Sequence, residues 1–313
     1  MPSRRHMGGL VLMLGAVACF IGMSTLVKLA REAGLATTEV MLWRMLPGIP
    51  LVAAWMHWRG IAWRPRRPGP VLLRSIFGGC AMGLYFWALS SLTLLQHSVI
   101  GLSQPVLVAV VAAPLLGERL RGAALLTLPI ALAGAALVVL PDAVLLDGDL
   151  SALHGLPLWA TVAAFGSATC SAIAHVLIRR ATGPVDGAGR EPDAPQTVVL
   201  WFAIVVSAGL LVLTAVRGEL PELVSTAPTP YALGLLLPMA GLGVVGQLML
   251  SAAYTRVAAP TIAVVGYARM PLGLLADVVV WSALAGVSGL LGAGLVLVAG
   301  WVLARDRSQP GAV

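Results

Sequence analysis

Charged residues are scarce in this sequence of 313 residues: Asp, Glu, Lys and Arg together make up 11% of it, whereas 59% is hydrophobic. A soluble domain carries roughly 25% charged residues. So low a charged fraction excludes a soluble globular domain of this length, because too little polar surface remains to face water. The sequence therefore predicts an integral membrane protein.

Cysteine and catalytic motifs are also almost missing. The three cysteines, Cys19, Cys80 and Cys170, lie in apolar segments without a Cys-x-x-Cys spacing, which is typical of small buried residues. The sequence has no His-Glu-x-x-His helix, no Walker A loop for ATP and no Gly-x-Ser-x-Gly elbow. We therefore expect neither an enzyme nor a bound metal or cofactor, and any transport must be driven by gradients.

Apolar runs of about 20 residues, the length that crosses the hydrocarbon core, are abundant instead. Ten of them follow one another with short connections, which leaves no room for a soluble domain. The sequence thus predicts an all-α integral membrane protein with ten transmembrane helices. The expected spans are Gly8–Ala30, Thr38–His57, Val71–Ser90, His97–Leu116, Gly122–Leu140, Gly155–Ile178, Thr197–Val216, Tyr231–Ala253, Pro260–Val280 and Ser288–Leu303.

Basic residues indicate the orientation of these spans, because cytoplasmic loops are enriched in Lys and Arg. Of the 20 basic residues, fourteen fall on the side of the N-terminus, three on the other side and three, Arg44, Arg74 and Arg269, within spans. We expect both termini in the cytoplasm and the protein in a bacterial inner membrane. The run RPRRPGP at residues 64–70 then predicts an anchor near anionic lipid and not a nucleic-acid site.

The two halves of the chain show weak similarity in the same order. Pro105 aligns with Pro271 at an offset of 166, and Trp43 aligns with Trp201 at an offset of 158. Because five helices are an odd number, a second copy enters the membrane from the opposite side, as in many transporters. We expect two inverted five-helix repeats, residues 1–146 and 147–313, with a site between them and with Pro105 and Pro271 as helix hinges.

One stretch carries a specific resemblance. PVLVAVVAAPLLGERLRGAAL, which starts at Pro105, closes the fourth span and opens the fifth, and it contains the Gly-Glu-Arg at residues 117–119. The second half carries AAYTRVAAP at residues 252–260 and Pro271, but Ala283 and Leu284 stand where its Gly-Glu is expected. Over its whole length the chain resembles the EamA-type branch of the drug/metabolite transporter superfamily. The resemblance implies a secondary carrier of small metabolites, often an exporter of amino acids or related compounds.

Two alternatives remain open. Within transport, the chain could take up or exchange a nucleotide-like or adenosyl metabolite, because nothing in the sequence determines the direction. In another class, a membrane-embedded sensor or enzyme would bind a metabolite without moving it. The expected partners are a small-molecule substrate and the lipid bilayer, with the chain acting as a monomer or a weak homodimer, and without nucleic acid.

Arg269 lies in the middle of the ninth span, where a charge costs ~2.5 to 3.5 kcal/mol on insertion scales. Gly266 and Gly273 flank it on the same helical stripe, and Pro271 leaves the Tyr267 carbonyl without its helical donor. Arg269 is either a ligand for an acidic group of the substrate or half of a structural pair. Asp277 is roughly 12 Å further along the axis, so it does not obviously neutralise Arg269.

Arg44 and Arg74 also lie within spans, but closer to the span ends than Arg269. Arg44, beside Trp43, is either an arginine whose side chain reaches the membrane interface or a charge in an outer cavity that attracts the substrate. Arg74 stands three residues into its span, which predicts an anchor that reaches the interface. Asp277 favours a structural or interfacial role over a proton or cation site.

Other polar and aromatic side chains complete the candidate site. Amides within spans need partners, so Gln104 and Gln247 either bind substrate or join helices. Histidine titrates near neutral pH, so His97 and His175 are candidate proton carriers or buried structural residues. The candidate substrate residues are Arg269, Arg44, Trp43, Gln104, Gln247, Tyr267 and Trp201, and the candidate coupling residues are His97, His175 and Asp277.

Overall fold

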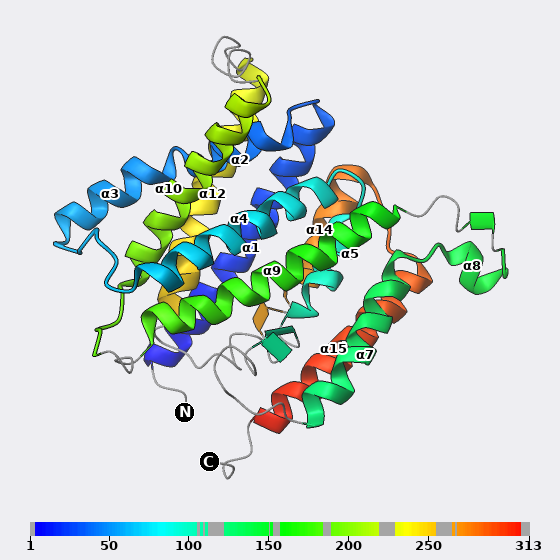
Figure 1. Ribbon diagram of the computed structural model, residues 1–313. Coiled ribbons are helices and arrows are strands. Elements are labelled where there is room, and N and C mark those ends of the chain that lie inside the picture. Colours follow the sequence, from blue (N-terminus) through cyan, green and yellow to red (C-terminus); the bar gives the residue numbers. More distant parts are fainter. Residues whose placement is uncertain are drawn as a thin grey trace.

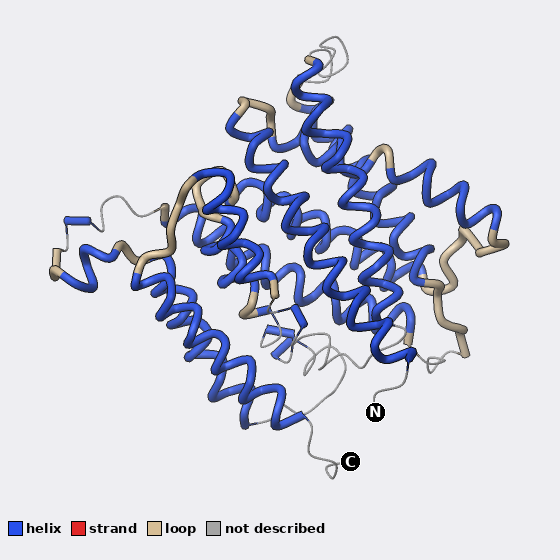
Figure 2. Tube along the Cα trace, turned by 180° about the vertical axis from the view of Figure 1, so that it is seen from behind, coloured by secondary structure: helices blue, strands red, loops and turns tan. Residues whose placement is uncertain are grey.

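The computed structural model describes residues 4–104, 107–108, 110–111, 122–149, 151–152, 157–183, 189–218, 229–254, 265–266 and 268–307. Within these ranges the regular structure is helical and contains no strand (Figures 1 and 2). The all-α fold that the composition predicts is confirmed. Large apolar side chains such as Val162, Val212 and Val279 are at least 60% exposed on the outside of the bundle, as suits a surface in contact with lipid.

Five of the described helices are long and apolar enough to cross a membrane: Met7–Glu32, Pro68–Ala88, Leu158–Thr182, Pro195–Val216 and Pro230–Leu250. They match the expected first, third, sixth, seventh and eighth spans. Parts of the fourth and ninth spans, with Pro105 and Tyr267, lie outside the described residues. The helices are α1 (Arg4–Glu32), α2 (Thr37–Met45), α3 (Gly48–Trp58), α4 (Pro68–Ala88), α5 (Leu94–Gly101), α7 (Gly122–Val139), α8 (Asp142–Leu146), α9 (Leu158–Thr182), α10 (Pro195–Val216), α12 (Pro230–Tyr254), α14 (Arg269–Trp281) and α15 (Val287–Arg307).

The expected second span is not one continuous helix, because α2 ends at Met45 and α3 begins at Gly48. Pro47 and Pro50 have no N–H to donate to the carbonyls four residues earlier. The Leu46 carbonyl instead accepts a hydrogen bond of 3.2 Å from the Ile49 N–H. The break leaves Arg44 in the last turn of α2, where the negative end of the helix dipole favours a cation.

Helices from the two halves of the chain pair along their lengths: α1 with α12, α4 with α9 and α7 with α15. In addition, α10 contacts α2 and α3, and α14 contacts α5. Suppose that the helices of each half are matched in chain order, α1 with α9 and α4 with α12. Exchange of the halves then turns the α1–α12 pair into the α9–α4 pair and leaves the α7–α15 pair unchanged. A twofold relationship produces this pattern of pairs.

Two glycines allow α7 and α15 to touch backbone to backbone. A Cβ added at Gly134 would lie 2.7 Å from the carbonyl oxygen of Gly292. A Cβ added at Gly292 would lie 2.7 Å from the backbone nitrogen of Val138. A Cβ at Gly294, on the same helix α15, would meet nothing within 4 Å. Small residues at helix crossings in membranes allow such close approach, and Gly292 therefore serves packing within the chain.

We expect Gly292→Ala to destabilise the protein by about 1 to 3 kcal/mol, because the added methyl group overpacks the α7–α15 crossing. Gly294→Ala is the matched control, and it should leave stability unchanged or raise it by about 0.5 to 1 kcal/mol through helix propensity. Thermal unfolding of the two variants in the same detergent checks this. Equal melting temperatures would contradict the tight crossing.

Candidate functional site

The first turn of α5 lies inside the bundle, and side chains satisfy all of its N–H groups. Thr93 Oγ1 accepts from the N–H of Gln96 at 3.1 Å, while Gln96 Oε1 accepts from the N–H of Thr93 at 3.0 Å. Asp277 accepts from the N–H groups of Leu94 and Leu95 at 2.9 and 2.7 Å. The orphan donors that a helix start leaves are thus all paired.

Asp277 reaches this helix from α14 and is 2% exposed. Its carboxylate lies at the positive end of the α5 dipole, where a negative charge interacts favourably with the helix. Gly273, one turn earlier on α14, makes the approach possible, since a Cβ there would lie 3.2 Å from the Leu94 carbonyl oxygen. Because both carboxylate oxygens already accept backbone hydrogen bonds, Asp277 holds α5 and α14 together.

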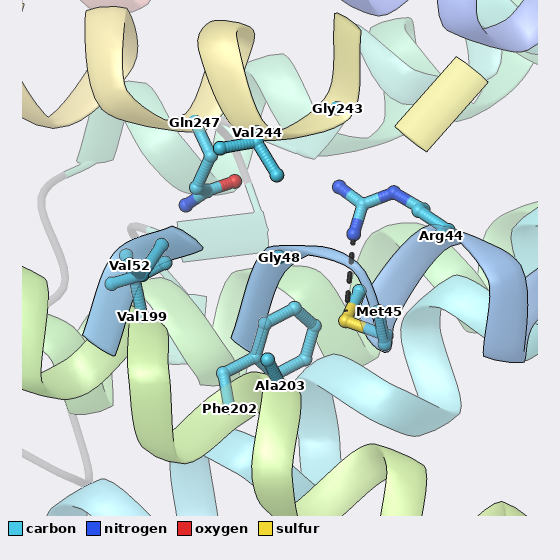
Figure 3. A pocket seen from close by; sticks show the side chains of 10 residues that line it. All are labelled: Arg44, Met45, Gly48, Val52, Val199, Phe202, Ala203, Gly243, Val244 and Gln247. Carbon is cyan, nitrogen blue, oxygen red and sulfur yellow. Dashed lines mark hydrogen bonds between the residues drawn. The ribbon is translucent and has the colours of Figure 1, made fainter. Parts of the chain in front are cut away.

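A cavity of about 30 Å³ lies beside the break between α2 and α3 (Figure 3). Each water needs about 10 to 15 Å³ of such space, so the cavity has room for about two waters. Arg44 and Gln247 line it, and their side chains extend toward it from the first and the second half of the chain. The remaining lining residues are Met45, Gly48, Val52, Val199, Phe202, Ala203, Gly243 and Val244.

Arg44 has only weak acceptors at this cavity. Its Nε donates to the sulfur of Met23 at 3.1 Å, and its Nη1 donates to the sulfur of Met45 at 3.7 Å. Thioether sulfur is a poor acceptor compared with a carboxylate. Among the described residues the one ion pair joins Arg66 and Glu191, so Arg44 has no carboxylate within 4 Å there. The structure thus places Arg44 at an internal cavity.

Arg74 is not an interface anchor, and that prediction is wrong. It is 6% exposed, and its guanidinium carbon lies 3.9 Å from the centroid of the Phe202 ring, which lines the same cavity. Its Nε and Nη1 have no hydrogen-bond partner within the described part of the chain. The charges of Arg74 and Arg44 are close enough to interact. Counting from the start of the span misses this site, because it ignores that α10 covers this face of α4.

Arg269 lies in a second polar cluster, formed by α5, α9 and α14. Its Nη1 is 3.3 Å from the position that a Cβ at Gly101 would take. Its charge acts on both His97 and His175. It makes no ion pair with any residue in the described ranges. The structure thus brings together three of the candidate residues, Arg269, His97 and His175.

The two histidines differ in their hydrogen bonds. His175 Nδ1 lies 2.9 Å from the amide nitrogen of Gln104 and 2.7 Å from the carbonyl oxygen of Ser171. His97 is 4% exposed, and its ring centroid lies 4.0 Å from that of Tyr85. Its Nε2 has no hydrogen-bond partner among the described residues. His97 therefore keeps a ring nitrogen available beside Arg269, whereas Nδ1 of His175 is held in place.

The other candidates lie elsewhere. Trp201 donates its Nε1–H to the carbonyl of Trp63 at 2.8 Å and does not line the cavity. Trp43 packs against a hydrophobic cluster that includes Phe86. Pro271 stands in the first turn of α14, where its missing N–H removes no helical hydrogen bond.

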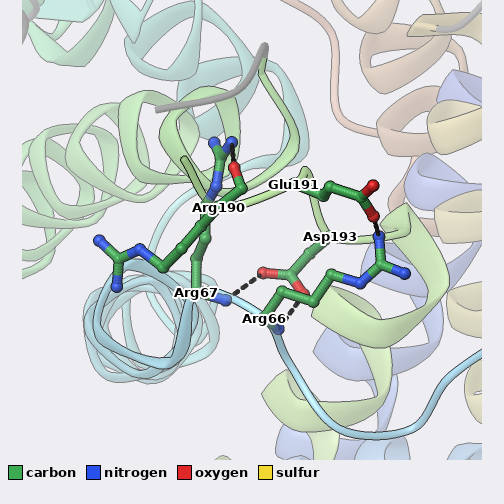
Figure 4. A network of polar contacts seen from close by, with 5 residues as sticks. All are labelled: Arg66, Arg67, Arg190, Glu191 and Asp193. Atoms are coloured by element: carbon green, nitrogen blue, oxygen red, sulfur yellow. Dashed lines mark hydrogen bonds and ion pairs between the residues drawn. The ribbon is translucent and has the colours of Figure 1, made fainter. Parts of the chain in front are cut away.

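At the end of the bundle that carries the N-terminus, the segment before α4 is fastened to the segment between α9 and α10 (Figure 4). Asp193 accepts the backbone N–H groups of Arg66 and Arg67 at 2.6 and 3.0 Å. The Arg67 side chain is 2% exposed and donates to the carbonyls of Arg180, Gly183 and Arg190. We call Arg66, Arg67, Arg190, Glu191 and Asp193 the polar clasp. For Arg67 the predicted contact with lipid is wrong, because the protein buries it.

Comparison with known proteins identifies relatives of the whole chain. The model of the EamA-like transporter family matches residues 7–140, which confirms the family resemblance. The chain is 26% identical over 302 residues to the pseudopaline exporter CntI of Pseudomonas aeruginosa strain UCBPP-PA14, covering 96% of both chains. It is also 26% identical over 299 residues to the CntI of strain PAO1 of the same species, again covering 96% of both chains.

A solved crystal structure has the same fold. It superposes with a TM-score of 0.60 at 20% sequence identity, and the match covers 95% of this chain and 98% of the other. At this identity the likeness concerns the fold alone.

We expect Asp277→Ala to lower the free energy of unfolding by about 1 to 3 kcal/mol, because it leaves the N–H groups of Leu94 and Leu95 without acceptors. Asp277→Asn keeps one acceptor and should cost less. Asp149→Ala is the control, since Asp149 is exposed and its carboxylate bonds to Ser151 in the same turn. Thermal unfolding in detergent measures all three. If Asp277→Ala leaves the melting temperature unchanged, the cap contributes nothing to stability.

Proposed function

Because this membrane protein carries an EamA-like transporter unit over residues 7–140, we propose that it is a secondary transporter that exports a small metabolite from the cytoplasm by alternating access. An amino acid or a related compound is the proposed substrate class. The pseudopaline exporters, which match nearly the full chain, support export in general. The mechanism needs a gradient and neither ATP nor a cofactor, and the chain acts as a monomer or a weak homodimer.

The exchange of helix partners between the halves is the observation that carries this proposal. We propose that residues 1–146 and 147–313 are inverted repeats. The α1–α12 and α9–α4 pairs support this, since each is the image of the other. Two similar halves that face opposite ways can adopt inward-open and outward-open shapes of nearly equal energy. The cavity that Arg44 and Gln247 line is too small for a metabolite, so it corresponds to a state in which the substrate path is shut.

The asymmetry of basic residues supports a cytoplasmic position for both termini. In that orientation the polar clasp lies on the cytoplasmic side and ties the two halves together there. Opening toward the cytoplasm requires the buried Arg67 to leave its three carbonyl acceptors. The clasp is thus the inner gate of the proposed cycle.

In the second polar cluster, Arg269 binds an acidic group of the substrate. This assignment rests on position, because Arg269 has no ion pair in the described ranges. His97 offers its Nε2 to the same substrate as a hydrogen-bonding group, since that nitrogen has no partner among the described residues. Gln104 and His175 form the wall of this cluster.

Counterflow in proteoliposomes tests the function. Vesicles that contain the full chain and unlabelled compound are diluted into labelled amino acids, adenosyl compounds or pseudopaline. We expect exchange of at least one amino-acid-type compound and a loss of about 10- to 100-fold in Arg269→Ala, the equivalent of a charge-assisted hydrogen bond of about 1.5 to 3 kcal/mol. Arg269→Lys should retain part of the activity.

Arg217→Gln is the control, because Arg217 is exposed at the end of α10. Saturable binding without exchange would instead make the protein a sensor. Exchange that survives both Arg269 changes would make Arg269 a structural residue.

The role of the polar clasp as an inner gate can be tested by comparing substitutions at Arg67 and at its neighbour Arg66. Arg67→Ala should raise the rate at which a cysteine at Ala203, in a background without native cysteines, reacts with an impermeant maleimide from the cytoplasmic side. We expect about 10-fold or more, because hydrogen bonds to a charged donor contribute about 1.5 to 3 kcal/mol each. Arg66→Ala is the control: its ion pair with Glu191 is exposed, and such pairs contribute only about 0 to 1 kcal/mol. Equal labelling rates in the two variants would show that the polar clasp is not the inner gate.

A further inference from the structure

Arg44 and Arg74 converge on one side chain in the interior of the bundle. Phe202 lines the cavity together with Arg44, and its ring stacks on the guanidinium of Arg74. The two arginines come from the first half of the chain and the phenylalanine from the second. We propose that Arg44 and Arg74 form an anion site that selects substrates with at least two acidic groups. This inference rests on the proposed transport function and names its substrate class.

Both guanidinium groups lack strong acceptors within the described residues. Arg74 is 94% buried, since 6% of it is exposed, and two of its three guanidinium nitrogens have no acceptor within the described residues. The stacking on Phe202 recovers part of the cost of burial, but an aromatic ring does not replace hydrogen bonds. Within the described ranges, the hydrogen bonds of Arg44 go to two methionine sulfurs. A guanidinium presents five donors in a planar fork that matches a carboxylate, and the described residues supply no carboxylate to either arginine.

No carboxylate of the described residues neutralises the charges of Arg44 and Arg74. The one ion pair within the described ranges is at the surface, between Arg66 and Glu191. Asp277, the buried carboxylate on α14, already accepts two backbone hydrogen bonds from the first turn of α5. Two cations close to each other in a low-dielectric interior also repel, which adds to the cost of burying each of them. A ligand with two negative groups removes both costs at once, whereas a ligand with one leaves one arginine unpaired.

Glycines lie beside both guanidinium groups. A Cβ at Gly78 would lie 3.2 Å from Arg74 Nη1 and 2.9 Å from the Phe202 ring. A Cβ at Gly243 would lie 3.4 Å from Arg44 Nε. At both positions glycine therefore gives the arginine side chain room that a Cβ would take. The cavity of about 30 Å³ is too small for a metabolite, so Phe202 must swing aside before one ligand can contact both arginines.

Binding to the full chain in lipid nanodiscs tests the site without any need for flux. The probes are glutarate and citrate, with monomethyl glutarate as a probe of similar size that carries a single carboxylate. We expect the wild type to bind glutarate at least 10-fold more tightly than the monoester. Arg74→Met and Arg44→Gln should abolish this preference, and Arg217→Gln should preserve it. Equal affinity for diacid and monoester, or no binding of either diacid, overturns the proposal.

The stability of the unliganded variants separates a ligand-binding arginine from a structural one. Loss of an unpaired buried charge should not lower the melting temperature, so Arg74→Met should melt at or above the temperature of the wild type. A lower melting temperature together with an unchanged preference for the diacid would give Arg74 a structural role and overturn the site.

Flux distinguishes this site from the proposed function. Preference for the diacid without exchange in proteoliposomes would keep the site and reject transport. Exchange of a neutral metabolite without binding of either diacid would keep transport and reject the site.

Discussion

A backbone N–H without an acceptor finds no water inside a bilayer to replace one, and the start of α5 meets this constraint with a carboxylate from the other half of the chain. Asp277 is separated from Leu94 by 183 residues, yet its two oxygens take both remaining donors of the first turn. Asp142 serves the start of α15 in the same way, through the N–H groups of Val287 and Ser288. Capping thus joins helices as well as ending them.

This thorough pairing of buried backbone donors makes the unpaired side chains informative. The protein satisfies the whole first turn of α5 but leaves nitrogens of Arg74 and His97 without partners among the described residues. Charged groups within a membrane are costly and usually serve substrates or ions. The two polar clusters, one around Phe202 and one around His97, therefore lower the stability of the fold, and they are the places where we expect function.

The membrane class and the helices α1, α4, α9, α10 and α12 follow from the length and apolarity of the spans. The prolines at residues 47 and 50 are typical of a helix break, but the apolar run around them is continuous and predicts a single span. Arg74 looked like an interface residue because sequence distance alone says nothing of α10, which covers it. The partner of Asp277 could not be found either, since a cap across 183 residues depends on tertiary packing and leaves no local pattern. The candidate substrate residues that the structure describes do not gather at one place: Arg44 and Gln247 share a cavity, whereas Trp201 lies elsewhere.

The exchange of helix partners has a consequence for biogenesis. The mate of α1 is α12 and that of α7 is α15, so the first half leaves the ribosome with faces that nothing in it can cover. Contacts so distant in sequence form late. Until then the face of α7 that carries Gly134 is exposed to lipid or to the insertion machinery. A nascent chain arrested after its fifth span therefore exposes helix faces without their partners, which membrane quality control can recognise. Assembly is completed only when α15 is inserted beside α7.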